Sequence, residues 1–130
     1  MPRRKTATRK VKKSSGEMFV AHVLDQLGEL GRVRARAMFG GHGIYHRDLM
    51  VGLIADGVLY LKVDAQNQAD FERAESRPFQ YHRKDKAKPI TMSYWEAPVE
   101  TLHNPRALCE WTRRSYEAAL RAKRGKTARK

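Results

Sequence analysis

The sequence predicts a two-layer α+β fold, in which helices pack on an antiparallel sheet of about five strands in the order α-β(3)-α-β(2)-α. Apolar residues repeat at helical spacing near both ends of the chain and alternate with polar residues in several segments between them. The links between the predicted strands are of hairpin length, which favours antiparallel pairing. A length of 130 residues is enough for one modest hydrophobic core.

The first helix is expected to begin at a capping box formed by Ser14 and Glu17. Its end is expected near Gly28 or Gly31. Apolar residues at helical spacing predict its buried stripe, which consists of Val20, Val23, Leu24, Leu27 and Leu30.

A strand with one basic face is predicted to follow, because the apolar period changes to two. The residues on its basic face are Arg32, Arg34 and Arg36. A bulge or sharp bend is then expected at three closely spaced glycines, Gly40, Gly41 and Gly43. After this bend an extended run resumes at Ile44.

The hairpin in the middle of the chain has the clearest local signal. Its strands are predicted at 49–55 and 58–63, and the intervening pair, Asp56 and Gly57, favours a type I′ turn. Both residues of such a turn have positive φ, which glycine and aspartate tolerate better than most residues. We therefore count Asp56 and Gly57, with the three glycines of the bend, as structural turn residues.

The second half of the chain is predicted to add a short helix, another hairpin and a closing helix. Asp64 is expected to cap the short helix, and strands are expected at 79–83 and 90–95. The closing helix is expected to have Pro105 at its first position and to remain ordered as far as Gly125.

The formal net charge of +13 is concentrated at the two ends of the chain. Residues 1–13 carry seven bases and residues 121–130 carry six, with no acid in either segment, so residues 14–120 are formally neutral. Runs of like charge bury too little apolar surface to offset the entropy of ordering. We therefore expect a disordered basic arm at 1–13, a folded domain at 14–120 and a basic arm at 121–130 that can prolong the last helix.

These arms and the basic strand are the candidate nucleic-acid-binding segments, because flexible basic chains neutralise phosphates without reading sequence. The candidate residues are Arg3, Arg4, Lys5, Arg9, Lys10, Lys12, Lys13, Arg32, Arg34, Arg36, Lys123, Arg124, Lys126, Arg129 and Lys130. The alternative is that these charges are merely solvated and keep the protein soluble. Base-specific reading is not predicted, since no recognition-helix, zinc-finger or aromatic RNA-binding pattern is present.

No pattern in the sequence predicts catalysis or metal binding. His42 and His46 would lie about 13 Å apart along a strand, too far to share a metal ion. Cys109 falls beside an apolar stripe and suits packing, and Glu96 has no evident partner acid or nucleophile. We therefore expect no catalytic residue, no metal and no cofactor.

The chain also lacks the pattern of a membrane protein. A membrane span needs roughly 18 uninterrupted apolar residues, and no such run occurs. The basic N-terminus is not followed by an apolar signal core. The expected location is the cytoplasm, with no membrane partner.

Several separated segments resemble the N-terminal domain of the TfoX/Sxy family. They are 37–45 (AMFGGHGIY), 52–64 (GLIADGVLYLKVD), 90–98 (ITMSYWEAP) and 108–111 (LCEW), and the resemblance covers nearly all of residues 17–120. These bacterial proteins are associated with regulation of natural-competence genes. The resemblance therefore implies a bacterial cytoplasm, with nucleoid association if the arms bind DNA. The resemblance implies a fold like that of type III secretion chaperones and no established catalytic residue. It also implies a missing part, because full-length competence regulators carry a second, helical C-terminal domain where this chain has a basic arm.

Two function hypotheses follow. In the first, the chain is a non-enzymatic regulatory adaptor, linked to transcription or competence-type regulation. It docks to an unidentified protein partner through its sheet or hairpin surface while its arms contact the backbone of DNA or RNA. In the second, it is a protein-interaction module, a homodimer in one version, with no nucleic-acid role.

Overall fold

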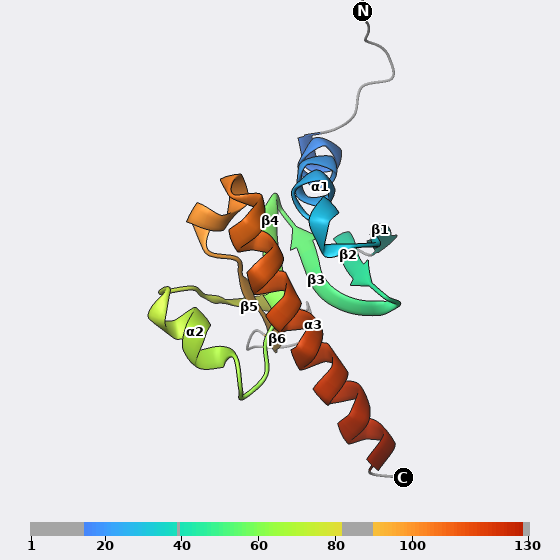
Figure 1. Cartoon of the computed structure of the whole chain (residues 1–130). Coiled ribbons are helices and arrows are strands. Elements are labelled where there is room, and N and C mark those ends of the chain that lie inside the picture. Colours follow the sequence, from blue (N-terminus) through green and yellow to red (C-terminus); the bar gives the residue numbers. More distant parts are fainter. Residues whose placement is uncertain (1–14, 39, 82–89, 129–130) are drawn as a thin grey trace, which may run out of the picture.

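The computed structural model describes residues 15–38, 40–81 and 90–128. They form a six-stranded sheet with helices packed on one face (Figure 1). The elements in chain order are α1 (Ser15–Gln26), η1 (Gly28–Leu30), β1 (Val33–Met38), β2 (Gly41–His46), β3 (Leu49–Ala55), β4 (Val58–Lys62), α2 (Gln68–Arg73), β5 (Pro78–Tyr81), β6 (Ile90–Glu96), η2 (Val99–His103) and α3 (Pro105–Ala128). The two-layer α+β class is confirmed.

The predicted count of about five strands is wrong, because the glycine segment reverses the chain instead of bending one strand. Gly40 has a φ of +82°, a conformation that suits glycine. The strands on either side then pair antiparallel, with Met38 opposite Gly41. The order of elements is therefore α-β(4)-α-β(2)-α, and Gly41 and Gly43 lie within β2 rather than in the bend.

The sheet has the strand order β1-β2-β3-β4-β6-β5, and all its pairs are antiparallel. The hairpin predicted between β3 and β4 is present, and Asp56 and Gly57 have φ values of 52° and 76°, as a type I′ turn requires. Arg47 and Asp48, between β2 and β3, also have positive φ. The β2–β3 and β3–β4 hairpins therefore both have a two-residue turn with positive φ, although only the second turn contains glycine.

A bulge in β3 changes which of its side chains face the helices. Ile44 lies opposite Gly52 whereas Tyr45 lies opposite Met50, so Val51 is the additional residue. Because side chains alternate along a strand, the additional residue shifts the alternation by one. Val51 and Ile54 both join the core as a result, and β3 bends in Figure 1.

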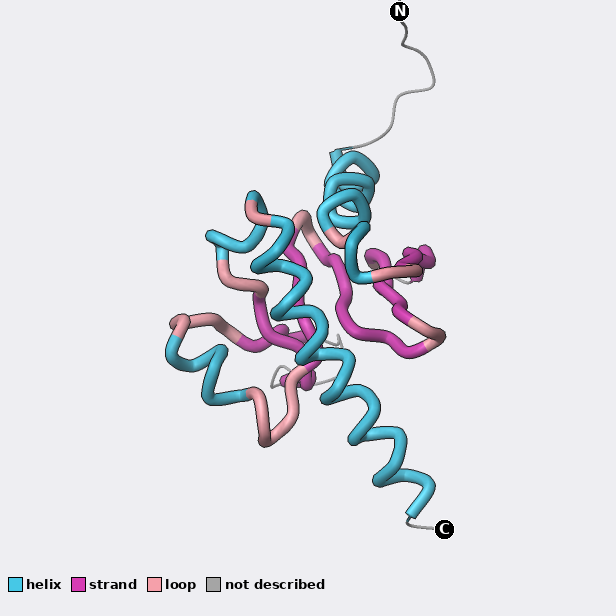
Figure 2. Tube along the Cα trace, in the orientation of Figure 1, coloured by secondary structure: helices cyan, strands magenta, loops and turns pink. Residues whose placement is uncertain are grey.

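The hydrophobic core lies between the sheet and the three helices, and α3 crosses β3 and β4 (Figure 2). The ring of Phe71 on α2 lies with its centroid 4.9 Å from Trp111 on α3 and 6.4 Å from Trp95 on β6. The buried members of the core are Val20, Val23, Leu27, Ile44, Val51, Ile54, Leu59, Leu61, Val63, Phe71, Ala97, Leu108 and Cys109. Among the described residues, no helix is long and apolar enough to cross a bilayer.

The helix boundaries depart from the sequence prediction at two places. Asp64 does not cap α2 directly, since it accepts hydrogen bonds from the amides of Gln66 and Asn67 in the turn before this helix. The prediction that Gly125 ends the closing helix is wrong, because α3 continues to Ala128. Ser14 of the expected capping box lies outside the described residues.

An ion pair fixes the extended part of α3 to the rest of the fold. Arg121 donates two hydrogen bonds to the carboxylate of Asp64, at 2.6 and 2.9 Å, and both side chains are about three-quarters buried. Arg121 lies in the segment predicted to be a basic arm that can prolong the last helix, and α3 includes it. The hydrogen bond from Arg121 is the main cause that lowers the pKa of Asp64.

Arg121→Gln is expected to lower the free energy of unfolding at neutral pH by about 1 kcal/mol, because the bidentate pair is lost. The pKa of Asp64 is lower in the folded chain, so the pair stabilises the fold above the unfolded pKa of about 3.9. This contribution is lost as the pH falls through the folded pKa. Urea denaturation from pH 7 down to pH 2 measures the difference, and the exposed neighbour Arg124→Gln is the control. Equal stabilities of the two variants at pH 7 would contradict the assignment.

Candidate functional site

The face of the sheet opposite the helices carries a patterned set of side chains, which we call the outer face. Cross-strand pairing and the pocket contacts described below place five of them in a first row, which consists of Arg34, Tyr45, Met50, Lys62 and Tyr94. A second row beside it consists of Arg36, Gly43, Leu53, Tyr60 and Glu96. The first row thus crosses five strands with cations and aromatic rings alternating around one methionine.

The cations of the first row lie over its tyrosine rings. The guanidinium carbon atoms of Arg34 and Arg36 are 5.4 and 5.8 Å from the centroid of the Tyr45 ring. The ammonium group of Lys62 is 5.1 Å from the centroid of the Tyr94 ring and donates to the hydroxyl of Ser93 at 2.8 Å. Cation–π attraction at these distances holds both kinds of side chain against the sheet.

A glycine in the second row leaves room for larger neighbours. A Cβ atom at Gly43 would lie 3.0 Å from the sulfur of Met38, 3.0 Å from the Tyr45 ring and 3.5 Å from the Met50 methyl group. These side chains therefore close over the glycine and form a continuous apolar patch. Met38 remains 45% exposed.

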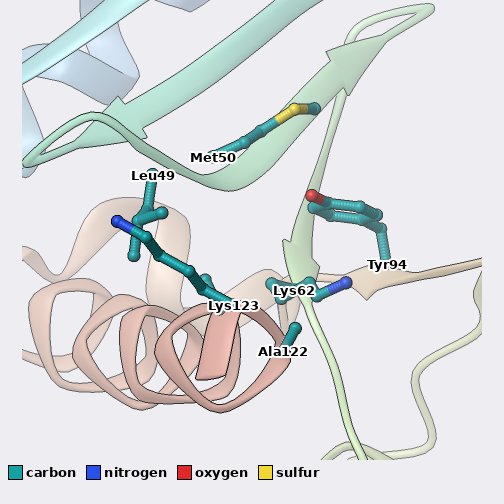
Figure 3. A pocket seen from close by; sticks show the side chains of 7 residues that line it. Leu49, Met50, Lys62, Tyr94, Ala122 and Lys123 are labelled. Carbon is teal, nitrogen blue, oxygen red and sulfur yellow. The ribbon is translucent and has the colours of Figure 1, made fainter. Parts of the chain in front are cut away.

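An open pocket of about 250 Å³ lies at one end of the first row, against α3 (Figure 3). Its lining residues are Leu49, Met50, Lys62, Tyr94, Ala119, Ala122 and Lys123. Figure 3 shows lysines contributed by two elements, β4 and α3, around an otherwise mainly apolar lining. This arrangement suits a ligand that has both an apolar part and a negative charge.

Two tyrosines of the outer face, Tyr94 and Tyr60, add no negative charge near neutral pH. Burial raises the pKa of Tyr94 to about 12, and the neighbouring Tyr45 contributes to the increase. Burial is also the main cause that raises the pKa of Tyr60, followed by the charges of Glu96 and Asp56. Both phenols therefore stay protonated and can donate hydrogen bonds.

The structure separates the predicted nucleic-acid-binding residues into two groups. Arg34 and Arg36 lie on the outer face, and Arg32 is exposed just before β1. Lys123 and Arg124 are exposed near the end of α3, where only the helical backbone of Lys126 is described. The others fall outside the described residues and are Arg3, Arg4, Lys5, Arg9, Lys10, Lys12, Lys13, Arg129 and Lys130.

Four members of the first row were not predicted as site residues, namely Tyr45, Met50, Lys62 and Tyr94. Period-two alternation within each strand indicates which residues share a face. It does not indicate which strands are neighbours, so it cannot bring Tyr94 on β6 beside Lys62 on β4. The bulge at Val51 also moves Met50 to the outer face against simple alternation.

The residues considered for catalysis lie in structural settings. Cys109 is buried and its thiol lies 3.6 Å from the carbonyl oxygen of Gln26. Burial raises the pKa of this thiol, and Glu29 adds to the effect, so the thiolate needed of a nucleophile is disfavoured. Glu96 lies opposite Tyr60 in the sheet. Within the described ranges no group of His, Cys, Asp and Glu residues is arranged to hold a metal ion.

Two histidines also have structural contacts. Nδ1 of His46 is 2.8 Å from the carbonyl oxygen of Arg32, and the ring of His46 packs edge-on against Tyr116. Nε2 of His22 is 2.9 Å from the carbonyl oxygen of Leu102. These contacts join β2 to the residue that precedes β1 and join α1 to η2, so both histidines serve the fold.

The fold and the outer face together define a small α+β domain whose antiparallel sheet has one helix-covered face and one face with cationic and aromatic side chains. Residues 25–119 match the model of the TfoX N-terminal domain. The chain therefore belongs to the TfoX N-terminal domain family, as the sequence motifs predicted. It is similar to the DNA transformation protein TfoX1 of Aliivibrio fischeri, with 38% identity over 56 residues. This match spans 43% of the present chain and 27% of that relative.

Proposed function

We propose that this chain is a non-enzymatic regulatory adaptor that takes part in competence-type gene regulation. The observation that carries the proposal is the family match across residues 25–119. The similarity to a relative named as a DNA transformation protein supports the same process. The buried position and raised pKa of Cys109 support only the assignment of this thiol to packing rather than to nucleophilic catalysis.

In this proposal the folded domain binds an unidentified protein partner and the basic ends of the chain hold it close to DNA or RNA. The charge distribution supports these separate roles for the domain and the ends. Residues 1–13 and 121–130 together carry thirteen bases and no acid, whereas bases and acids balance in residues 14–120. Weak backbone contacts of this kind raise the local concentration of the adaptor without selecting a sequence. Exposed Lys123 and Arg124 would contribute from the end of α3.

The proposal is tested by neutralising the arms in the 130-residue chain. Arg121 is left unchanged, since it pairs with Asp64. The substituted residues, each changed to glutamine, are Arg3, Arg4, Lys5, Arg9, Lys10, Lys12, Lys13, Lys123, Arg124, Lys126, Arg129 and Lys130. Binding to duplex DNA and duplex RNA is measured across a salt series. The native chain is expected to bind with a slope of about −0.9 per phosphate contacted on DNA, and the neutralised chain to lose most of this slope.

A control variant removes charge from the helix side, through Arg106→Gln and Arg113→Gln, and is expected to retain nearly native binding. If the neutralised chain binds as tightly as the native chain, the arms are not the anchor. If the native chain binds no nucleic acid even at low salt, the protein-interaction module is the better description. Sedimentation at increasing concentration then tests its homodimeric version.

A further inference from the structure

The arginines on the two sides of the molecule have different surroundings. On the helix side, Arg114 pairs with Asp70 at 3.2 Å and with Glu110 at 3.3 Å, so its charge is matched by carboxylates. On the outer face, Arg34 and Arg36 lie over the Tyr45 ring. Arg34 also pairs with Asp48 at 3.1 Å, but this aspartate is 89% exposed and such pairs are weak in water.

The charge balance of the outer face favours an anionic ligand. The two rows contain the three bases Arg34, Arg36 and Lys62 against one acid, Glu96. Lys123 adds a further base beside the first row, at the pocket. Tyr94 and Tyr60 beside these bases remain neutral, because burial raises the pKa of both.

The length of the first row matches a short stretch of single-stranded nucleic acid. The row crosses β1, β2, β3, β4 and β6, which are four neighbouring intervals in the sheet. Three of these intervals join paired residues at about 4.8 Å each, and the pocket lies at the fourth, between Met50 and Lys62, so the row extends for roughly 14 Å or more. Sheets that bind single-stranded RNA stack two or three bases on such a face.

We propose that the first row, with the pocket beside it, binds single-stranded nucleic acid. Bases stack on Tyr45, on the guanidinium groups of Arg34 and Arg36, and on Tyr94, while Lys62 and Lys123 attract the phosphates. Both aromatic rings and guanidinium planes are surfaces on which unpaired bases stack. The proposal goes beyond the regulatory adaptor described above, because it assigns base contacts to the folded domain and does not depend on the arms.

Two other anions fit the same surface less well. Duplex DNA can neutralise the cations, but its bases are already stacked inside the helix and leave the tyrosines without a role. An acidic peptide likewise uses the charges and has no planar group to place on the rings. The alternation of cations with aromatic residues along the first row is the feature that single-stranded nucleic acid explains.

The test compares three ligands of equal length by equilibrium binding to the full chain. They are ten thymidine nucleotides, a ten-unit abasic strand with the same phosphates, and a ten-base-pair duplex. The native chain is expected to bind the thymidine strand roughly tenfold more tightly than the abasic strand, because stacking requires bases. Equal affinity for the two single strands would overturn the proposal.

Variants then locate the preference on the first row. Tyr45→Leu is expected to reduce the preference for thymidine over abasic strands several-fold, whereas Tyr45→Phe keeps the ring and retains it. Arg34→Gln with Arg36→Gln is likewise expected to reduce this preference, because the guanidinium groups on which bases stack are removed. Lys62→Gln with Lys123→Gln is expected to reduce the salt slope on single strands by about 1.4, since each phosphate contact contributes about 0.7. The control is the helix-side pair Arg106→Gln with Arg113→Gln, which is expected to change neither quantity. Circular dichroism and thermal melting confirm that each variant folds.

Two further outcomes keep this proposal separate from the function of the arms. The arm-neutralised chain is expected to retain the preference for bases, even where its duplex affinity is lost. If Tyr45→Leu leaves this preference unchanged, the first row is not a nucleic-acid site. The same conclusion follows if the variant of Arg34 and Arg36 still binds the thymidine strand but no longer binds a glutamate-rich decapeptide. The second result would identify it as a site for acidic peptides.

Discussion

Replacing Gly41 by alanine is expected to lower the free energy of unfolding by about 3 kcal/mol or more. A Cβ atom at this position would lie 2.0 Å from the carbonyl oxygen of Ile54 and 3.1 Å from its carbonyl carbon. These are backbone atoms of the neighbouring strand and cannot rotate away as a side chain can. β2 and β3 would have to separate at the start of their ladder. Urea denaturation followed by far-ultraviolet circular dichroism measures the loss.

Gly28→Ala is the matched control for this substitution. A Cβ atom at Gly28 would have no other atom within 4 Å and its φ is not positive, so the variant is expected to stay within about 0.5 kcal/mol of the native chain. A native unfolding midpoint for Gly41→Ala would show that β2 and β3 do not approach as closely as described.

Phe71→Ala is expected to destabilise the domain by about 3 to 5 kcal/mol. The Phe71 side chain is 1% exposed and its ring lies between those of Trp95 and Trp111, which come from β6 and α3. Removing the ring leaves a cavity where three elements meet. Because these two tryptophans are the only ones in the chain, their fluorescence reports the change directly, and we expect emission at longer wavelength as water reaches them.

Val99→Ala provides the comparison, since Val99 is 73% exposed and its truncation is expected to change the stability by less than about 0.5 kcal/mol. An unchanged tryptophan spectrum in Phe71→Ala would contradict the described packing. The result also bears on the outer face, because β6 carries Trp95 toward the helices and Tyr94 toward the opposite side. The packing of Phe71 therefore helps to hold one end of the first row in place.

Local features of the sequence were sufficient for much of the fold. The type I′ turn at Asp56 and Gly57 depends on two adjacent residues that tolerate positive φ. The helical spacing of Val20, Val23 and Leu27 produced a buried stripe along α1 and the residue that follows it, as predicted. Such features need only neighbouring residues, so they can be recognised without knowing how the strands are arranged.

The number of strands and the role of Arg121 could not be obtained in this way. A run of glycines permits either a bend within one strand or a reversal between two strands, and the partner strand decides between them. Arg121 appears in the sequence as one more base in a basic arm, and its carboxylate partner is 57 residues away. In both cases the deciding contact is distant in the sequence.

The sequence by itself determined that this is an α+β domain of the TfoX N-terminal family, formally neutral in residues 14–120 and strongly basic at its ends. Only the tertiary structure decided which residues share the outer face. Each strand specifies its own alternation, but the order of strands and the bulge at Val51 set which side chains become neighbours. For this reason Arg34, Tyr45, Met50, Lys62 and Tyr94, scattered over 61 residues of sequence, form one row only in the folded sheet.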